Sequence, residues 1–542
     1  MIQRINEKIL DLLKLKKDDF TDFDTSKNRI DLYLLNNKII NEEVLLQVYK
    51  QLFNLDIVDL NLINVDYDIV KQFTSDFIDK YHLIPLKLEN DVLDIGITDP
   101  FDIYGIDKIN CFIKDKKIHL VLCSKSKLLT LKQKVFSVIS RKSLVDEQNK
   151  LIEQDEVNDE LSDITSSYIV KLVDSIIKEA ICLSASDIHL EPFDEIVNVR
   201  YRIDGTLVNS SSLTKEVYKS ITSRIKILAN LDISKTLIPQ DGRITFNYNR
   251  IDYDLRISSI PVINGERIVI RILNSKGFNY NLENIGFSLE DLEYIRKVID
   301  LPYGIILLTG PTGSGKSTTL YVFLKELLKK DLNIITVEDP VEYNIPGINQ
   351  INVNNKTNLT FGVGLKAILR QDPNIIMIGE IRDEETASTA VRAAITGHLV
   401  FSTLHTNTAV STVNRLVDMN VKPYFLSDAL ACVINQRLIR KLCPHCKKEI
   451  SLNTKEFSKV YIPTGCPACN NTGYLGRIMV YEILKVTDEV KKLITEGAST
   501  QEIQKFINTK GFKSITNNTK KLVNEGITSI DELLKIKYDL NE

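Results

Sequence analysis

The sequence predicts a multidomain α/β protein, and three observations indicate this fold class. At 542 residues, the chain is too long for a single hydrophobic core, so roughly two to four domains are expected. Its second half alternates short apolar runs with helical segments, which is typical of a mostly parallel sheet. Its first half mixes helical and extended patterns without that regular alternation. We therefore expect the parallel sheet in the last domain and α+β domains before it.

The composition is that of a soluble globular protein with nearly balanced charge. Hydrophobic residues make up 43% and charged residues 26% of the chain, and 69 Lys+Arg against 72 Asp+Glu give a net charge of −3. A basic excess is missing, which argues against nucleic acid as a partner. No apolar run approaches the roughly 20 residues of a membrane span, and the start, "MIQRINEKILDLLKLKKDDF", lacks the apolar core of a signal peptide. We expect a cytoplasmic protein, and any link to a membrane would have to go through a partner.

Residues 1–140 are predicted to form a separate N-terminal α+β domain. The segment "NEEVLLQVYKQLF" has helical apolar spacing with Asn41 as its N-cap, and "IPLKLENDVLDIGITDP" resembles a hairpin that ends in a turn at Asp99. Residues 141–164 are acidic and poor in aromatic side chains, so we interpret them as a linker or an exposed helix.

Residues 165–275 and 285–542 are predicted to be two further domains, joined by a hinge at 276–284. The first begins with a helix, "SSYIVKLVDSIIKEAICL", and continues with the strand-like runs "NVRYRIDGTL", "GRITFNYNRIDYDLRISSIP" and "ERIVIRIL". The second contains the strands "YGIILLTG", "NIITVED", "NIIMIGE" and "HLVFSTLH", separated by helical segments. The last domain is therefore the α/β domain with the mostly parallel sheet.

A glycine-rich stretch, "GPTGSGKST", follows the first strand of that domain and matches G-x-x-x-x-G-K-[ST]. Its glycines let backbone N–H groups point at phosphate oxygens, while Lys316 can reach the β- and γ-phosphates and Ser317 can ligate Mg²⁺. The motif thus predicts ATP and Mg²⁺ as ligands. The nucleotide-binding residues that we expect are Gly310, Pro311, Thr312, Gly313, Ser314, Gly315, Lys316, Ser317 and Thr318.

Acidic and histidine blocks follow three other strands of this domain. Glu342 lies in "TVEDPVEY" after one predicted strand, and Glu380 directly follows "NIIMIG", the place of an acid that holds Mg²⁺. His398 and His405 flank the strand in "ITGHLVFSTLHT". Either histidine alone has about even odds of being a strand-end or core residue. Together they favour a position near the phosphates or at a subunit boundary.

Eight cysteines divide into four single residues and two CxxC pairs. Cys111, Cys123, Cys182 and Cys432 lie in apolar segments, where small buried thiols are expected. The paired spacing fits a tetrahedral site of four thiolates, which leaves no open position and predicts structural Zn²⁺. Pairwise redox activity is the alternative. The paired residues are Cys443, Cys446, Cys466 and Cys469.

These blocks, in this order and spacing, resemble the secretion ATPase superfamily that powers type II secretion and type IV pilus assembly. The segments that carry the resemblance are "LPYGIILLTGPTGSGKSTTLY", "EDPVEY", "LRQDPNIIMIGEIRD", "AAITGHLVFSTLHTN" and "QRLIRKLCPHC". The resemblance implies a RecA-like P-loop ATPase domain at 285–542 with a zinc-binding insertion at about 440–472. It further implies a PAS-like α+β domain at 165–275 and a partner-binding or regulatory domain at 1–140.

The resemblance also implies roles for single residues. Glu342 would orient or deprotonate the attacking water, and Glu380 would serve Mg²⁺ together with Ser317. His398 and His405 would lie near the γ-phosphate or relay its state. The block "SASDIHLEPFDEIVNVRYRIDG" matches the small α+β domain of the family. Arginines that follow it would reach the nucleotide, whereas without the resemblance they would be surface residues of a hairpin. These arginines are Arg256, Arg271 and, less firmly, Arg267.

The resemblance implies a homo-hexamer that acts on an inner-membrane platform protein and a cytoplasmic-side adaptor. The cysteine insertion and the long N-terminal region favour assembly or secretion over pilus retraction, but they leave pilus assembly and type II secretion both open. A RecA-like nucleic-acid or DNA-transfer motor is the alternative from another class, and DNA-stimulated hydrolysis would distinguish it. A nucleotide-regulated scaffold without turnover is a third reading, against which the intact Lys316, Glu342 and Glu380 argue.

The N-terminal region resembles a domain that binds cyclic di-GMP in some assembly ATPases. The sequence keeps Arg29 of that binding pattern but has Asp31 and Lys38 where glycines belong, and Leu52 where a glutamine belongs. Without those glycines, close approach of the backbone to the ligand is hindered. We therefore predict no tight binding of cyclic di-GMP.

Overall fold

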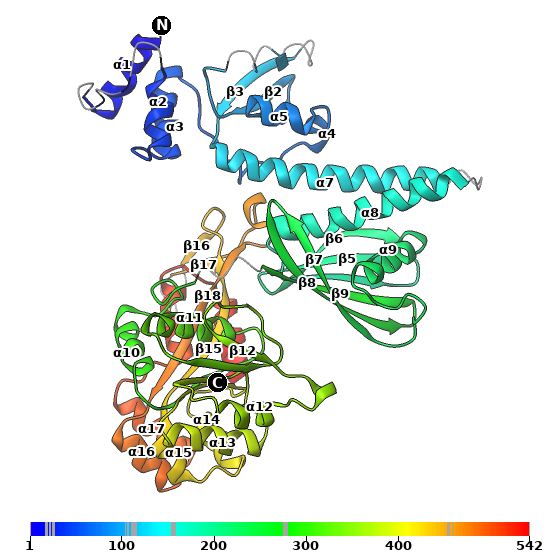
Figure 1. Cartoon of the computed structure of the whole chain (residues 1–542). Helices are drawn as coiled ribbons and strands as arrows, with labels where there is room; N and C mark the ends of the chain where they lie inside the picture. Colours follow the sequence, from blue (N-terminus) through cyan, green and yellow to red (C-terminus); the bar gives the residue numbers. More distant parts are fainter. Residues whose placement is uncertain are drawn as a thin grey trace. The chain divides into compact units, whose positions relative to one another are not determined.

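A computed structural model describes the chain as two compact units, Met1–Leu273 and Asn274–Glu542 (Figure 1). Cys111 and parts of the predicted linker and hinge lie outside the described residues. The described residues are 2–540 except 17–19, 21–22, 24–27, 103–104, 106–107, 110–115, 153–158, 275–279, 452–455 and 458.

The N-terminal part of the first unit combines short helices with a small sheet. The order of its described strands is β1-β2-β3, with β1 antiparallel and β3 parallel to β2. The predicted N-cap at Asn41 is confirmed, because its side chain accepts a hydrogen bond from the N–H of Val44. The predicted hairpin is confirmed as the antiparallel pair β1-β2. The elements are α1 (Ile2–Leu13), α2 (Ile30–Asn36), α3 (Glu42–Phe53), α4 (Tyr67–Val70), α5 (Ser75–Tyr81), β1 (Leu83–Glu89), β2 (Val92–Ile97) and β3 (Lys117–Leu122).

Two long helices contain the described part of the segment that we interpreted as a linker or an exposed helix. They are α7 (Lys125–Ile152) and α8 (Asp159–Cys182). The described residues of the acidic segment are thus helical. The second half of α8 is buried, because Leu172, Ile176 and Ala180 pack in the core of the sheet that follows.

This sheet has the order β6-β5-β4-β9-β8-β7 among the described residues of the first unit. Side chains alternate between its faces, so Ile188 and Leu190 of β4 enter a core that α8 and α9 cover. The other face carries Asp187, His189 and Glu191 of the same strand. The elements are β4 (Asp187–Pro192), β5 (Ile196–Ile203), β6 (Thr206–Thr214), α9 (Lys215–Leu228), β7 (Gln240–Tyr248), β8 (Ile251–Val262) and β9 (Gly265–Asn274).

The second unit is built on a larger sheet with the order β12-β11-β13-β14-β10-β15-β18 among its described strands. The pairs from β12 to β15 are parallel, and β18 is antiparallel to β15. The four predicted strands are confirmed as β10, β11, β13 and β14. The sheet strands are β10 (Gly304–Thr309), β11 (Ile334–Glu338), β12 (Asn349–Asn352), β13 (Ile375–Ile378), β14 (Leu399–Leu404), β15 (Leu430–Leu442) and β18 (Tyr474–Lys485).

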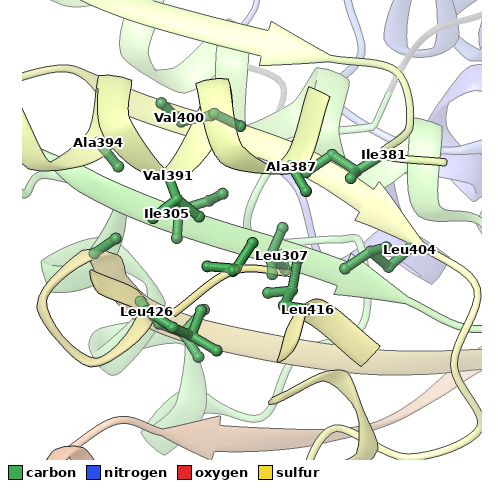
Figure 2. Packing of buried hydrophobic residues seen from close by; sticks show 14 of the residues in the cluster. Ile305, Leu307, Ile381, Ala387, Val391, Ala394, Val400, Leu404, Leu416 and Leu426 are labelled. Atoms are coloured by element: carbon green, nitrogen blue, oxygen red, sulfur yellow. The ribbon is translucent and has the colours of Figure 1, made fainter. Parts of the chain in front are cut away.

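Helices cover both faces of this sheet, which explains why its central strands are apolar without alternation. Figure 2 shows one face, where Ile305 and Leu307 of β10 pack near Ala387 and Val391 of α13. On the other face, residues such as Ile306 pack with α10 and α11. The helices of these layers are α10 (Leu289–Ile299), α11 (Lys316–Leu327), η2 (Leu328–Lys330), η3 (Asn355–Thr357), α12 (Phe361–Ile368), α13 (Glu384–Ile395), α14 (Ser411–Asp418) and α15 (Pro423–Ala429).

The rest of the second unit is a small insertion and a helical C-terminal part. The insertion lies between β15 and β18 and contains a two-stranded antiparallel sheet in its described part. None of the described helices in either unit has the length and apolar composition of a membrane span. The elements are β16 (Lys448–Ser451), β17 (Lys459–Ile462), η4 (Pro467–Cys469), α16 (Asp488–Thr495), α17 (Thr500–Thr509), α18 (Ile515–Asn524) and α19 (Ile530–Leu540).

Candidate active site

The glycine-rich stretch forms a loop between β10 and α11, as the motif predicts. Gly313 and Gly315 adopt φ values of +78° and +89°, a region in which side chains are strained. Lys316 is buried and its Nζ donates to the carbonyl oxygens of Gly310 at 2.8 Å and Pro311 at 3.0 Å. The Ser314 hydroxyl is buried and has no hydrogen-bond partner among the described residues. Because a buried hydroxyl is rarely left unsatisfied, this atom fits a loop that holds a phosphate ligand.

Strand β15 supports this loop through residues that the sequence analysis did not single out. The Gln436 amide donates to the Ser314 carbonyl at 2.8 Å, and its oxygen accepts from Thr319 at 3.0 Å. A Cβ on Gly310 would lie 2.4 Å from the Gln436 carbonyl, so only glycine fits there. The Arg437 guanidinium, also buried, donates to the Asn407 carbonyl at 3.2 Å. Polar residues inside the apolar run "LACVINQRLIRKL" were the available signal.

Glu380 and His405 lie at the same edge of the sheet as the loop, where the carboxyl ends of the parallel strands meet. Glu380 follows β13 and pairs with Arg382, and its other oxygen lies 3.8 Å from Nε2 of His405. Burial lowers the pKa of Lys316 to about 8, although the charge of Glu380 opposes this shift. Burial and the charge of Lys316 lower the pKa of His405, which favours its neutral form. The structure thus brings these three predicted residues together.

Glu342 lies in the loop after β11, also at this edge, and is half-buried. Its backbone N–H donates to the hydroxyl of Tyr321 at 3.1 Å. The other glutamate of the block, Glu338, ends β11 and is buried. It accepts hydrogen bonds from the side chains of Tyr321, Thr336 and Gln350. The two glutamates therefore differ, because Glu338 is held in a buried network and Glu342 lies in the loop beside it.

His398 does not join this cluster within the chain, so its predicted place near the phosphates or at a subunit boundary stays a prediction. It precedes β14, and its carbonyl accepts from the N–H of Gly304 at 3.1 Å, the first residue of the parallel strand β10. Its ring lies 3.0 Å from the Ala393 carbonyl. A strand of six residues separates it from His405, which amounts to about 20 Å. Since β10 and β14 are parallel, His398 lies at the sheet edge opposite the loop.

The four paired cysteines converge in the insertion. Their sulfurs all lie within 4.8 Å of one another, with Cys443–Cys466 at 3.7 Å and Cys446–Cys469 at 3.9 Å. Four sulfurs that surround Zn²⁺ tetrahedrally are about 3.8 Å apart, so the cluster fits this ion. Burial opposes ionisation of Cys469, but N–H groups of Cys466 and Gly473 at 3.2 Å lower its pKa to about 7. Such a site cross-links the insertion and supplies no open coordination position.

Comparison with known proteins agrees with this geometry. The family model "Type II/IV secretion system protein" matches residues 163–535. The chain belongs to this family. A further model, the MshEN domain, matches residues 53–140. The family predicted from the motifs is thus confirmed, and so is the multidomain α/β fold class.

Relatives and a solved structure extend the match. The chain is 44% identical to the type II secretion system protein HxcR of Pseudomonas aeruginosa, over 71% of this chain and 80% of that protein. It is 35% identical to the type IV pilus assembly ATPase PilB of Myxococcus xanthus, over 98% and 97% of the two chains. The ATPase DotB of Legionella pneumophila shares the fold, with a TM-score of 0.53 at 22% identity over 67% of this chain and 95% of that one.

The predicted arginines of this family member lie in the first unit, on the charged face of its sheet. Arg271 is opposite Asp187 in the register, and its Nε lies 3.1 Å from that carboxylate. Arg267 donates to the buried Glu191 at 2.7 Å. Arg256 lies 3.9 Å from Asp254. Of the three, Arg271 has the most exposed side chain, at 59%, so it is the best placed to bind a ligand from outside its own unit. That reach stays a prediction.

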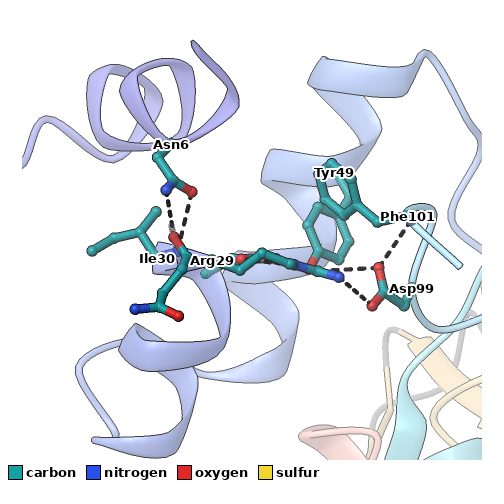
Figure 3. A network of polar contacts seen from close by, with 8 residues as sticks. Asn6, Arg29, Ile30, Tyr49, Asp99 and Phe101 are labelled. Carbon is teal, nitrogen blue, oxygen red and sulfur yellow. Dashed lines mark hydrogen bonds and ion pairs between the residues drawn. The ribbon is translucent and has the colours of Figure 1, made fainter. Parts of the chain in front are cut away.

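Arg29 is held by carboxylates of its own unit (Figure 3). Its guanidinium pairs with Asp31 at 2.5 Å and with Asp99 at 2.6 Å, and it lies 4.3 Å from the centre of the Phe101 ring. Tyr49 also donates to Asp31 at 2.5 Å. Asp31, which replaces a glycine of the cyclic di-GMP pattern, therefore neutralises the arginine that the pattern would use. The geometry supports the prediction of no tight binding, which stays a prediction.

Proposed function

We propose that the chain hydrolyses ATP and uses the free energy to assemble type IV pili or type II secretion pseudopili on an inner-membrane platform protein. The observation that carries the proposal is the convergence of Lys316, Glu380 and His405 beside the loop of Ser314, whose buried hydroxyl has no hydrogen-bond partner in the part of the chain that the structure describes. The names of the two relatives support both kinds of cargo. They do not favour a DNA motor, so we do not propose one.

In this proposal, each group acts at the carboxyl edge of the large sheet. Lys316 exchanges its two carbonyl acceptors in the loop for phosphate oxygens, and Ser314 gains an acceptor from the same ligand. Glu342 orients or deprotonates the attacking water. Ser317 and Glu380 would hold Mg²⁺, which would neutralise charge on the phosphates. The neutral His405 lies against Glu380 and responds to the state of the site.

We propose a homo-hexamer, as the resemblance to the secretion ATPases implies, in which arginines of the first unit would stabilise charge on the bound nucleotide. An arginine suits that role because its planar group stays charged. The chain would act in the cytoplasm, at the inner membrane through the platform protein and an adaptor, without nucleic acid. The tetracysteine cluster would hold Zn²⁺ as a structural ion.

Purified chain with Mg²⁺ and ATP should release phosphate, and double-stranded or single-stranded DNA should not stimulate the rate. A rate that rises severalfold with DNA would favour the motor alternative. Co-purification from cells with a polytopic membrane protein should identify the platform, and a chain that is fully active as a monomer would contradict the proposed hexamer.

A further inference from the structure

The backbone of the loop that carries Glu342 donates hydrogen bonds to side chains from outside the loop. At its start, the N–H of Val341 donates to Oδ1 of Asn352 at 2.8 Å, and at its end the N–H of Ile345 donates to Oε1 of Gln350 at 2.8 Å. Both acceptors lie on or beside the edge strand β12. The amide of Gln350 also donates to the Tyr343 carbonyl at 3.0 Å. Strand β12 therefore fixes the two ends of the loop.

The middle of the loop is fastened from a different element, the helix of the phosphate loop. Tyr321 lies on α11, which begins at Lys316, and its side chain is fully buried. Its hydroxyl accepts from the N–H of Glu342 at 3.1 Å and donates to the carboxylate of Glu338. Burial and the charge of Glu338 raise the pKa of Tyr321, so the hydroxyl keeps the proton that it donates.

Glu338 is fixed in turn, because it also accepts from Thr336 at 2.6 Å and from Gln350 at 3.0 Å. A buried carboxylate with three donors is a rigid acceptor, and its fixed position determines where the tyrosine hydroxyl lies. One hydroxyl thus connects three parts of the site: the phosphate-loop helix, the end of β11 and the backbone of Glu342.

We propose that Tyr321 is a positioning residue for the hydrolysis reaction, whose hydroxyl sets the place of Glu342 relative to the phosphate loop. This inference rests on the proposed function, in which Glu342 acts on the attacking water. Tyr321 itself is too deeply buried to contact that water, so it acts through the backbone of Glu342. Misplacement of a catalytic group by a fraction of an ångström lowers kcat without weakening the binding of ATP through Lys316.

The test is Tyr321→Phe, which removes only the hydroxyl and keeps the ring that lies 5.9 Å from the ring of Tyr343. We expect kcat to fall about tenfold while KM for ATP stays within twofold. On a Glu342→Ala background, Tyr321→Phe should lower the residual single-turnover rate by less than twofold, because both changes disable the same group.

Tyr481→Phe is a matched control in the same unit. The Tyr481 hydroxyl also accepts from a backbone N–H, that of Ser288 at 2.9 Å, and donates to a buried carboxylate, Asp291 at 2.8 Å. It fastens the start of α10 and not the loop of Glu342. We expect a similar decrease in Tm for both variants but an unchanged kcat for Tyr481→Phe.

An unchanged kcat of Tyr321→Phe beside an active wild type would contradict the inference, and so would equal losses of kcat in the two variants. If Tyr321→Phe lowered the rate on the Glu342→Ala background as much as in the wild type, Tyr321 would not act through Glu342. Absence of hydrolysis by the wild-type chain is a different result, since it contradicts the proposed function itself.

Discussion

The two large sheets of the molecule place their charged side chains in different ways. In the second unit, both faces of the sheet are covered and the charged candidates lie at the carboxyl edge, as Lys316, Glu380 and His405 do. In the first unit, one face of the sheet packs under helices and the other carries ion pairs such as Arg267–Glu191 and Arg271–Asp187. In the parallel sheet of the second unit, the role of a charged residue therefore depends on which end of a strand it follows. In the antiparallel sheet of the first unit, its role depends on the residue that faces it on the neighbouring strand.

Of the variants that test this comparison, Lys316→Ala should lower the rate of ATP hydrolysis most. Loss of the ammonium removes the main contact of the loop with the phosphates, so hydrolysis should fall below detection in a phosphate-release assay. Lys325→Ala is the matched control, because this lysine is exposed on the same helix, and its variant should keep the wild-type rate. Residual activity above a tenth of wild type in Lys316→Ala would contradict the proposed site.

Glu342→Ala and Glu380→Gln should each lower kcat by about 10²–10³, the range for loss of a general base or of a metal-holding acid. Glu380→Gln should also raise the Mg²⁺ concentration needed for half-maximal activity, whereas Glu342→Ala should not. The Mg²⁺ dependence of the initial rate measures the difference. The same Mg²⁺ dependence in both variants would mean that the two carboxylates do not have separate roles.

The two histidines at the ends of β14 test directly whether only side chains at the carboxyl edge of the parallel sheet serve the site. His405→Ala should lower kcat about tenfold, because the ring lies beside Glu380 and near Lys316. His398→Ala should change kcat by less than twofold, because its ring lies at the opposite edge. Initial rates at saturating ATP compare the two. Equal losses would show that His398 serves the site from a position that a single chain does not explain, such as a subunit boundary.

The smallest effects are expected on the charged face of the sheet in the first unit. Arg271→Ala should lower kcat severalfold with little change in Tm, because the arginine is mostly exposed beside Asp187. Arg267→Ala should lower Tm by a few degrees, because it leaves the buried Glu191 with less compensation. Thermal unfolding and steady-state kinetics on both variants separate the two effects. A reversed pattern would move the nucleotide-facing role to Arg267.

The sequence predicted the strands that carry the site because each ends an apolar run in a recognisable polar block. It predicted the sulfur cluster because the spacing of four cysteines is nearly sufficient to define the site. It treated His398 and His405 alike, although the parallel order of strands implies that only one end of β14 can face the loop within a single chain. The apolar pattern of a strand does not indicate which of its two ends lies beside the phosphate loop. Only the order and direction of the strands in the sheet show this.

Other parts of the site depend on contacts that no local pattern encodes. Gln436 and Arg437 lie in β15, about 120 residues after the phosphate loop that they support, and their register against β10 became known only from the folded sheet. Within "EDPVEY" only the resemblance distinguished Glu342 from Glu338, because the physical difference is their contact with the buried hydroxyl of Tyr321. Likewise, Arg29 matched a ligand-binding pattern, but its ion pair with Asp99 comes from a distant loop.

The central claim is that ATP binds through the phosphate loop and is hydrolysed by acids at the same sheet edge. A single-turnover experiment with radiolabelled ATP on wild type, Lys316→Ala and Glu342→Ala tests it most directly. We predict that wild type binds and converts the nucleotide, that Glu342→Ala retains it as ATP, and that Lys316→Ala retains none. Conversion at the wild-type rate by Glu342→Ala, or wild-type retention by Lys316→Ala, would contradict the account.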